Sequence, residues 1–266
     1  MRSEALSLEI APFPGGEGHV AWLTVDRAER RNAMTRSMWE ALGGFLEEVE
    51  RIPGVRALVL RGRPGSFCAG ADLDELRSLT PPEVDAAFAL MEATLEKVER
   101  LGAPTLAVAD GVAAGAGLEL LLACDLRLGT PRARLGMPVA RLGILPGVAF
   151  AARLVRAAGP ARATELLLTG RLLPAEEALA WGLLSRLVPE GEVEAALASL
   201  LGELARLSPA SLRAAKRAVS ASARALAAAG GESWPPQEEA RAATIDPASF
   251  YEAVRAWAEG RPPFSG

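Results

Sequence analysis

A single acid stands in a helix-like apolar run, at a place where it could take part in catalysis. The run follows a strand-like segment at 104–110, and a string of small residues leads into it as far as Gly117. The first N–H groups of a helix have no partner inside it, so they can bind an anion or a carbonyl oxygen. Glu119 lies within one turn of those donors. The stretch 111–125 could therefore supply both an oxyanion hole and a general acid or base.

The same stretch has a second interpretation that the residues leave open. Small residues also permit tight helix packing, and a glutamate near a helix start is common because it complements the helix dipole. The stretch does not match Gly-x-Gly-x-x-Gly, and no Gly-Lys-Ser/Thr follows it. These absences argue against a loop that binds nucleotide phosphates.

A second stretch has the same order of a strand, a glycine-containing turn and a helix-like run. It follows the strand-like run 55–60 and contains Phe67-Cys68-Ala69-Gly70-Ala71-Asp72-Leu73. This heptapeptide resembles a signature of the crotonase, or enoyl-CoA hydratase/isomerase, superfamily, and the stretch 111–125 resembles that family's second signature. The resemblance continues from Asn32-Ala33 through 142–147 to the final 261–266, so it covers nearly the whole chain in order.

The resemblance implies a fold and an assembly. The family's fold is an α/β spiral of ββα turns, followed by a C-terminal helical trimerisation element. We accordingly expect an acyl-CoA-binding spiral core at 1–189 and a helical oligomerisation region at 190–266. The family's usual assembly predicts a homotrimer or homohexamer. Trp234, Phe250 and Trp257 in the last segments would be difficult for a monomer to cover, which also favours an oligomer.

The resemblance also implies a chemistry and a set of site residues. Enzymes of the family bind acyl-CoA thioesters, and two backbone N–H groups hold the thioester oxygen while it gains negative charge as an enolate. The matching donors here are those of Ala71 and Ala116, and Glu119 matches the first of the two glutamates of the hydratases. Coenzyme A enters as part of the substrate, and no separate cofactor is expected. The candidate substrate-binding residues are Arg31, Ala33, Ala69, Gly70, Ala71, Asp72, Leu73, Gly115, Ala116, Pro138 and Val139.

The sequence departs from the family pattern at the second acid. In the family, the second glutamate normally follows a proline in the segment that corresponds to 133–143 here. In this sequence Pro138 is followed by Val139, which cannot transfer a proton, and the next residues offer no carboxylate. The lysine that contacts adenine after the first signature is also absent, with Asp74 in its place. Nucleotide contacts would then depend on the backbone of 69–73, on Arg31, and on Arg261 of a neighbouring subunit. Each arginine could equally be an ordinary surface charge.

Three functions fit these observations. The leading interpretation is hydration of an enoyl-CoA thioester with Glu119 as acid and base. A different reaction on the same scaffold, such as a double-bond shift, decarboxylation or thioester hydrolysis, is the first alternative, and a non-catalytic acyl-CoA-binding protein is the second. Val139 supports both alternatives, whereas Glu119 argues against the second.

Composition restricts the other classes of function. The chain has 266 residues, a formal net charge of -4 and a pI of about 5.4, which argues against a general nucleic-acid-binding protein. No run of about 18 apolar residues occurs without a charge, so no membrane span is expected. The start lacks a secretory pattern, and we expect a cytoplasmic protein. One histidine and two separated cysteines give no metal-binding spacing.

Several elements must position these residues. We expect a hairpin from 6–10 and 20–25, a helix over 36–50 capped by Thr35, and a helix over 81–101 that starts at Thr80-Pro81. Short strands at 57–60, 125–128 and 183–188 and helices between them favour parallel pairing and an α/β class. Beyond residue 190 the pattern is helical, and Asp246 caps a last helix with Phe250, Val254 and Trp257 on one face.

Overall fold

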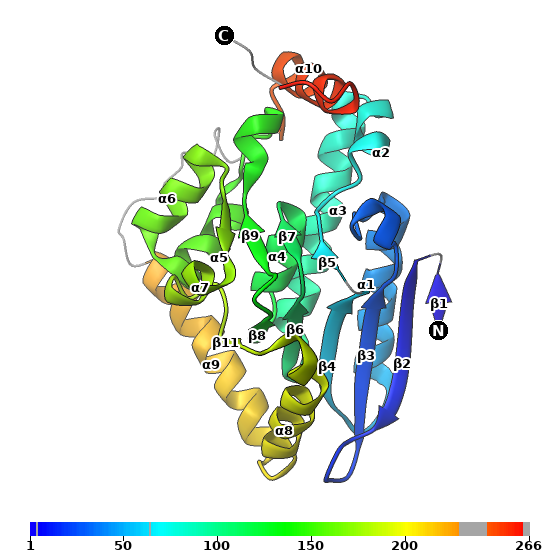
Figure 1. Ribbon diagram of the computed structural model, residues 1–266. Coiled ribbons are helices and arrows are strands. Elements are labelled where there is room, and N and C mark those ends of the chain that lie inside the picture. The colour runs from blue at the N-terminus through cyan, green and yellow to red at the C-terminus, as the bar shows by residue number, and fades with distance from the viewer. Residues whose placement is uncertain (4, 64, 229–243, 263–266) are drawn as a thin grey trace.

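Two sheets and the helices around them form the body of the molecule (Figure 1). The computed structural model describes residues 1–262 apart from 4, 64 and 229–243. The larger sheet has the order β1-β2-β3-β4-β6-β8-β11, and the smaller one has the order β10-β9-β7-β5. The strands of the larger sheet are β1 (Arg2–Ser3), β2 (Leu6–Pro12), β3 (His19–Val25), β4 (Val55–Gly62), β6 (Thr105–Ala109), β8 (Leu126–Gly129) and β11 (Arg186–Leu187). Those of the smaller sheet are β5 (Ser66–Cys68), β7 (Val112–Ala114), β9 (Arg134–Gly136) and β10 (Leu172–Pro174).

The chain winds between the two sheets as a spiral. Strands β4, β6 and β8 pair in parallel in the larger sheet, while β5, β7 and β9 pair in parallel in the smaller one. Each strand of the first set is followed by one of the second set and then by a helix. These helices are α2 (Leu73–Ser78) with α3 (Pro81–Arg100), then α4 (Ala116–Leu122), and finally η2 (Pro138–Leu142) with α5 (Val148–Ala158). This succession confirms the predicted α/β fold of ββα turns.

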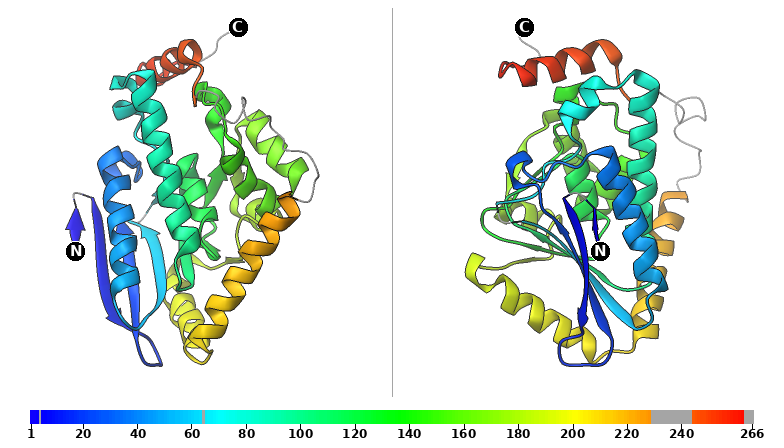
Figure 2. Two further views of the ribbon diagram at one scale, coloured as in Figure 1. Left: turned by 180° about the vertical axis from the view of Figure 1, so that it is seen from behind. Right: turned by 90° about the vertical axis from the view of Figure 1, so that its right-hand side faces the viewer.

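The local signals in the sequence account for the best-defined elements. The hairpin forms from β2 and β3, which pair antiparallel over their whole length. Helix α1 (Arg36–Arg51) begins after Thr35, whose Oγ1 accepts a hydrogen bond from the Met38 N–H. Helix α3 begins after Thr80, whose N–H donates to the Glu83 carboxylate at 2.7 Å. The two helices pack on each other beside the larger sheet, as Figure 2 shows.

The remaining helices lie mostly in the C-terminal part. They are η1 (Ala28–Arg30), α6 (Pro160–Thr169), α7 (Ala175–Ala180), η3 (Glu190–Glu192), α8 (Val193–Ala205), α9 (Pro209–Ala228) and α10 (Pro247–Ala258). The strand expected at 183–188 is shorter than predicted, because only 186–187 pair with β8. Helix α10 contacts both α2 and η2 at one end of the molecule. Among the described residues, no helix is long and apolar enough to cross a membrane.

The expectation that a monomer would have difficulty covering the large apolar groups of the last segments is wrong for Phe250. Phe250 and Val254 are fully buried within the chain, since α10 packs them against the body. Trp257 remains 48% exposed, and Trp234 lies outside the described residues. The division at 189/190 and the trimeric or hexameric assembly stay predictions, which sedimentation of the protein in solution would test.

Candidate active site

Two glycine-containing loops lie side by side at the ends of β5 and β7. The strands pair in parallel, with Cys68 opposite Ala113. Gly70 has a φ of 109°, and a Cβ added to it would lie 2.8 Å from the Ala114 oxygen and 3.4 Å from the Ala116 nitrogen. A side chain at Gly70 would therefore separate the loops. The structure thus brings together the Ala71 and Ala116 segments that the sequence singled out.

Among the described residues, the backbone of each loop leaves one N–H group available for a ligand. Ala71 forms a parallel bridge with Met34, in which Met34 N–H donates to Gly70 and Asp72 N–H donates to Met34. In this arrangement the N–H of Ala71 itself faces away from Met34. Ala116 is the first residue of α4, so its N–H has no acceptor inside the helix. This geometry suits an oxyanion hole.

Packing explains part of the small-residue run as well. A Cβ added to Gly117 would lie 2.0 Å from the Cys68 oxygen, so only glycine lets α4 pack this closely on β5. Gly115 precedes the helix with a φ of 54°, a conformation that favours glycine. The two interpretations of the stretch are therefore compatible, because close packing is what holds the Ala116 N–H beside the Gly70 loop.

Glu119 is fully buried on α4, one turn after Ala116. Its Oε2 accepts a hydrogen bond from Arg153 Nη1 at 3.2 Å, and Arg153 on α5 is itself 3% exposed. Its Oε1 is buried and has no hydrogen-bond partner within the described structure. A buried polar atom without a partner is costly, so Oε1 is the atom that a water molecule or a substrate would satisfy.

Arg153 is shared among three carboxylates. Its Nη2 and Nη1 contact the two oxygens of Glu92 at 2.5 and 2.8 Å, and its Nε contacts Glu99 at 3.1 Å. Burial raises the pKa of Glu119 from 4.5 to about 8; Arg153 opposes this rise, and Glu92 and Glu99 add to it. The same carboxylates raise the pKa of Arg153, which stays charged. Glu119 can therefore carry and exchange a proton near neutral pH.

Val139 occupies η2 as a core residue. It is 4% exposed, follows the half-buried Pro138, and belongs to the same hydrophobic cluster as Leu118 of α4. Ala140 is exposed next to it, and the Arg141 side chain donates to the Thr169 oxygen at the end of α6. The segment thus offers no carboxylate in place of the expected second acid.

The candidate nucleotide-binding residues lie in the loop before α1 and at the start of α2. Arg31 is exposed with a φ of 50°, and its oxygen accepts from the Ala69 N–H at 3.0 Å. The oxygen of Ala33 and the carboxylate of Asp72 both accept from Arg27. The side chain of Asp72 also caps α2, whose first residue is Leu73. Any contact of Asp72 with a substrate would thus be made by its backbone.

Two further charged residues that the sequence singled out, Asp74 and Arg261, are paired within the chain. Asp74, at the place of the family's lysine, contacts Arg30 at 2.7 Å. Arg261 contacts Glu259 at 2.6 Å and Glu252 at 2.7 Å, so the structure gives it partners inside its own chain.

Sequence reasoning missed Arg153, Glu92 and Glu99. Their partners lie far away along the chain, and each reads as a surface charge on a helix. One signal for Arg153 was available in the sequence. Glu119 stands in an apolar run, and a buried glutamate is costly unless a cation pairs with it. Glu92 and Glu99 are also seven residues apart, which places them on one face of α3.

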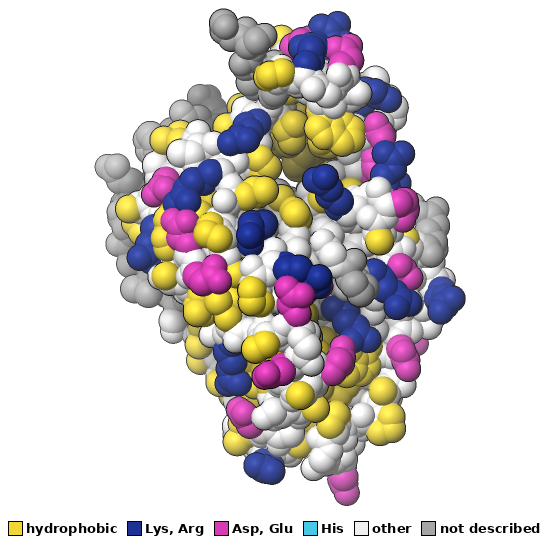
Figure 3. All heavy atoms as spheres, in the orientation of Figure 1, with side chains coloured by type: hydrophobic (Ala, Val, Ile, Leu, Met, Phe, Trp, Pro, Cys, Tyr) yellow, Lys and Arg dark blue, Asp and Glu magenta, His cyan; other side chains and the backbone are white. Residues whose placement is uncertain are grey.

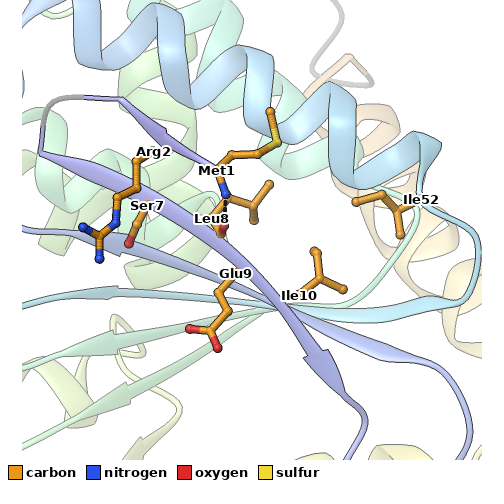
Figure 4. A pocket seen from close by; sticks show the side chains of 7 residues that line it. All are labelled: Met1, Arg2, Ser7, Leu8, Glu9, Ile10 and Ile52. Carbon is orange, nitrogen blue, oxygen red and sulfur yellow. Dashed lines mark hydrogen bonds between the residues drawn. The ribbon is translucent and has the colours of Figure 1, made fainter.

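Two of the hollows on the surface lie in different places. Figure 3 shows hydrophobic side chains inside a hollow below α10, on the face that α2 and η2 border. A separate pocket of about 480 Å³ lies between the N-terminal strands and Ile52 (Figure 4). Arg2, Ser7 and Glu9 supply its polar side chains, and none of the candidate site residues lines it. We therefore place the candidate site at the β5 and β7 loops rather than at this pocket.

Backbone N–H groups near a buried acid whose pKa is raised would suit a carbonyl group that gains negative charge. Comparison with known proteins gives the family. The model of the enoyl-CoA hydratase/isomerase family matches residues 15–266, and the chain belongs to that family.

Individual relatives agree with this assignment. The chain is 34% identical to mitochondrial methylglutaconyl-CoA hydratase of Homo sapiens over 247 residues, which cover 91% of this chain and 72% of that protein. It is 38% identical to a probable enoyl-CoA hydratase of Mycobacterium tuberculosis over 189 residues, which cover 71% and 72%. The crystal structure of an enoyl-CoA hydratase from Bacillus anthracis superposes with a TM-score of 0.76 at 30% identity, covering 98% of both chains.

Proposed function

We propose that this protein hydrates short enoyl-CoA thioesters, with Glu119 as the single group that moves the proton. The observation that carries the proposal is the buried Glu119, which lies in the first turn of α4 with Ala116 and whose Oε1 has no hydrogen-bond partner among the described residues. The relatives named hydratases support the same reaction class.

In the proposed reaction, the thioester oxygen accepts hydrogen bonds from the N–H groups of Ala71 and Ala116. Glu119, as the carboxylate, takes a proton from water while the water oxygen adds to the β carbon. The electron pair of the double bond moves toward the thioester oxygen and forms the enolate, which the two donors stabilise. Glu119 then delivers its proton to the α carbon, so the carboxylate is restored and the atoms of one water molecule have been added.

Val139 makes this hydratase slow. Where two carboxylates share the proton transfers, each can orient the water or hold the proton at the right moment. One positioned acid or base typically raises the reaction rate by about 10²–10⁴-fold. With valine at this place, Glu119 performs both transfers alone. We propose weak but real turnover rather than none.

A double-bond shift is the second candidate, and the single carboxylate favours it. One base suffices to carry a proton between the α and γ carbons. Against it stands the position of the acid, because the family's single-glutamate isomerases usually keep the acid at the place of Val139. A protein that binds acyl-CoA without turnover is the third candidate.

Absorbance of the conjugated thioester separates these functions. A hydratase removes the absorbance of a 2-enoyl-CoA, whereas an isomerase creates it from a 3-enoyl-CoA. Calorimetric titration with a saturated acyl-CoA runs alongside as the measure of binding. Loss of 2-enoyl absorbance is the expected result; formation of absorbance from the 3-enoyl substrate would favour the isomerase, and binding without either change would favour the binding protein.

A further inference from the structure

The two oxygens of Glu119 have different surroundings. Oε2 is bonded to Arg153 at 3.2 Å, while Oε1 is buried without a partner in the described structure. A carboxyl group held by one oxygen cannot rotate freely, so the bond to Arg153 fixes which oxygen has no partner in the described structure. Arg153 comes from α5, a different element from the loops that carry the backbone donors.

The charges that act on Glu119 come from two neighbouring helices. Arg153 lies on α5, and Glu92 and Glu99 lie on α3. Strands β6 and β7 bring no charged residue against α4, and Cys68 of β5 is a neutral thiol because burial raises its pKa to about 12. One guanidinium therefore serves three carboxylates, of which Glu92 holds it with two bonds and Glu119 with one.

We propose that Arg153 is a positioning residue that holds Oε2 of Glu119, leaving Oε1 as the oxygen that exchanges a proton, and that Glu92 and Glu99 weaken this hold. The catalytic use of Oε1 rests on the proposed function, but the effect of Arg153, Glu92 and Glu99 on the pKa of Glu119 does not.

Glu92 and Glu99 link α3 to α5 through Arg153, and they also influence the protonation of Glu119. If Arg153 faced Glu119 alone, the buried pair would favour the carboxylate and lower its affinity for a proton. The two further carboxylates draw the guanidinium away and add negative charge. Because arginine does not release its proton in proteins, the cluster cannot conduct the Glu119 proton to solvent. Proton exchange must then occur at Oε1.

A carboxyl titration without substrate tests the proposal. Glutamate is labelled with ¹³C at the side-chain carboxyl, and the Glu119 signal is assigned by its loss in Glu119→Gln. Arg153→Lys removes the fork that reaches Glu119, so the Glu119 midpoint should rise by about one pH unit. Glu92→Gln frees Arg153 for Glu119, so the midpoint should fall by about half a pH unit. Glu92 is partly exposed, which makes this variant the more tolerant of the two.

Glu96→Gln is the matched control. Glu96 lies on the same helix but pairs with Arg100 at 2.9 Å, and it should leave the Glu119 midpoint unchanged. Opposite movements in Arg153→Lys and Glu92→Gln support the proposal. An unchanged midpoint in folded Glu92→Gln, or equal movement in Glu96→Gln, would overturn it and leave Arg153 as a link between α3 and α5. Because no substrate is present, this result is independent of whether hydration occurs.

Discussion

By the resemblance of their sequence motifs, Glu119 and Val139 stand at the two places where a hydratase of this family would carry its acids, and their surroundings in the structure differ. Glu119 is a buried carboxyl with Arg153 as its counter-charge, and its Oε1 has no partner in the described structure. Val139 is a core side chain in the hydrophobic cluster. Burying a carboxyl is costly, and the Arg153 guanidinium offsets part of that cost at Glu119. Under the proposed function, this difference leaves Glu119 as the one carboxyl group for proton transfer beside the backbone donors.

The largest effect is expected from Glu119→Gln. The amide keeps the shape of the side chain but cannot accept and return a proton, so turnover should fall by about 10²–10⁴-fold. Circular dichroism and acyl-CoA binding serve as controls for folding. A folded, substrate-binding variant with the wild-type rate would make Glu119 a structural residue and remove the contrast with Val139.

A slightly smaller loss is expected from Ala116→Pro. Ala116 is the first residue of α4, where proline is tolerated, so the variant removes the N–H donor while the helix can still form. Losing one oxyanion-hole donor typically costs about 10²–10³ in rate. Ala116→Gly retains the donor and should remain active. Similar rates in both variants would contradict the assigned donor.

A modest gain is expected from Val139→Glu. A carboxyl at this place could share the proton transfers, and we expect a rise of about tenfold, below the full 10²–10⁴ because the pocket is packed around valine. Val139→Gln has nearly the same size without the acid and should show no gain. If the folded glutamate variant binds substrate but is no faster than the glutamine variant, the pocket is shaped for another reaction.

A further prediction concerns stability. The pKa of Glu119 is raised from 4.5 to about 8, so the native state binds more protons than the unfolded state between these values. The stabilisation from this group is complete below pH 4.5 and is lost as the pH rises through about 8. Denaturant unfolding across this range should show a steeper decline for wild type than for Glu119→Gln. Parallel curves would mean that Glu119 is not the group with the shifted pKa.

Much of the fold was predictable because its signals are local. Thr35 and Thr80 cap helices where the sequence placed them, and the hairpin of β2 and β3 follows its alternating pattern. The smaller sheet was less visible, since β5, β7, β9 and β10 have three residues each. Strands this short carry no readable periodicity, and their pairing depends on the spiral as a whole.

The candidate site likewise contains residues that the sequence predicts and residues that it does not. The two backbone donors and Glu119 stand in motifs that the sequence displays directly. Arg153 does not, because its partners Glu119 and Glu92 lie 34 and 61 residues away along the chain. Trp257 and Phe250 share a helix, but their burial differs because only the body of the protein decides which side of α10 it covers.

The pH dependence of kcat/KM for hydration tests the central claim most directly. Glu119 must begin and end the reaction as the carboxylate, in hydration and in dehydration alike. Because its pKa is about 8, kcat/KM should rise through that pH in both directions, and the rise should be absent from the residual rate of Glu119→Gln. A profile that is flat or falling across neutral and mildly alkaline pH would contradict the account, since the proton would then be moved by a group other than Glu119.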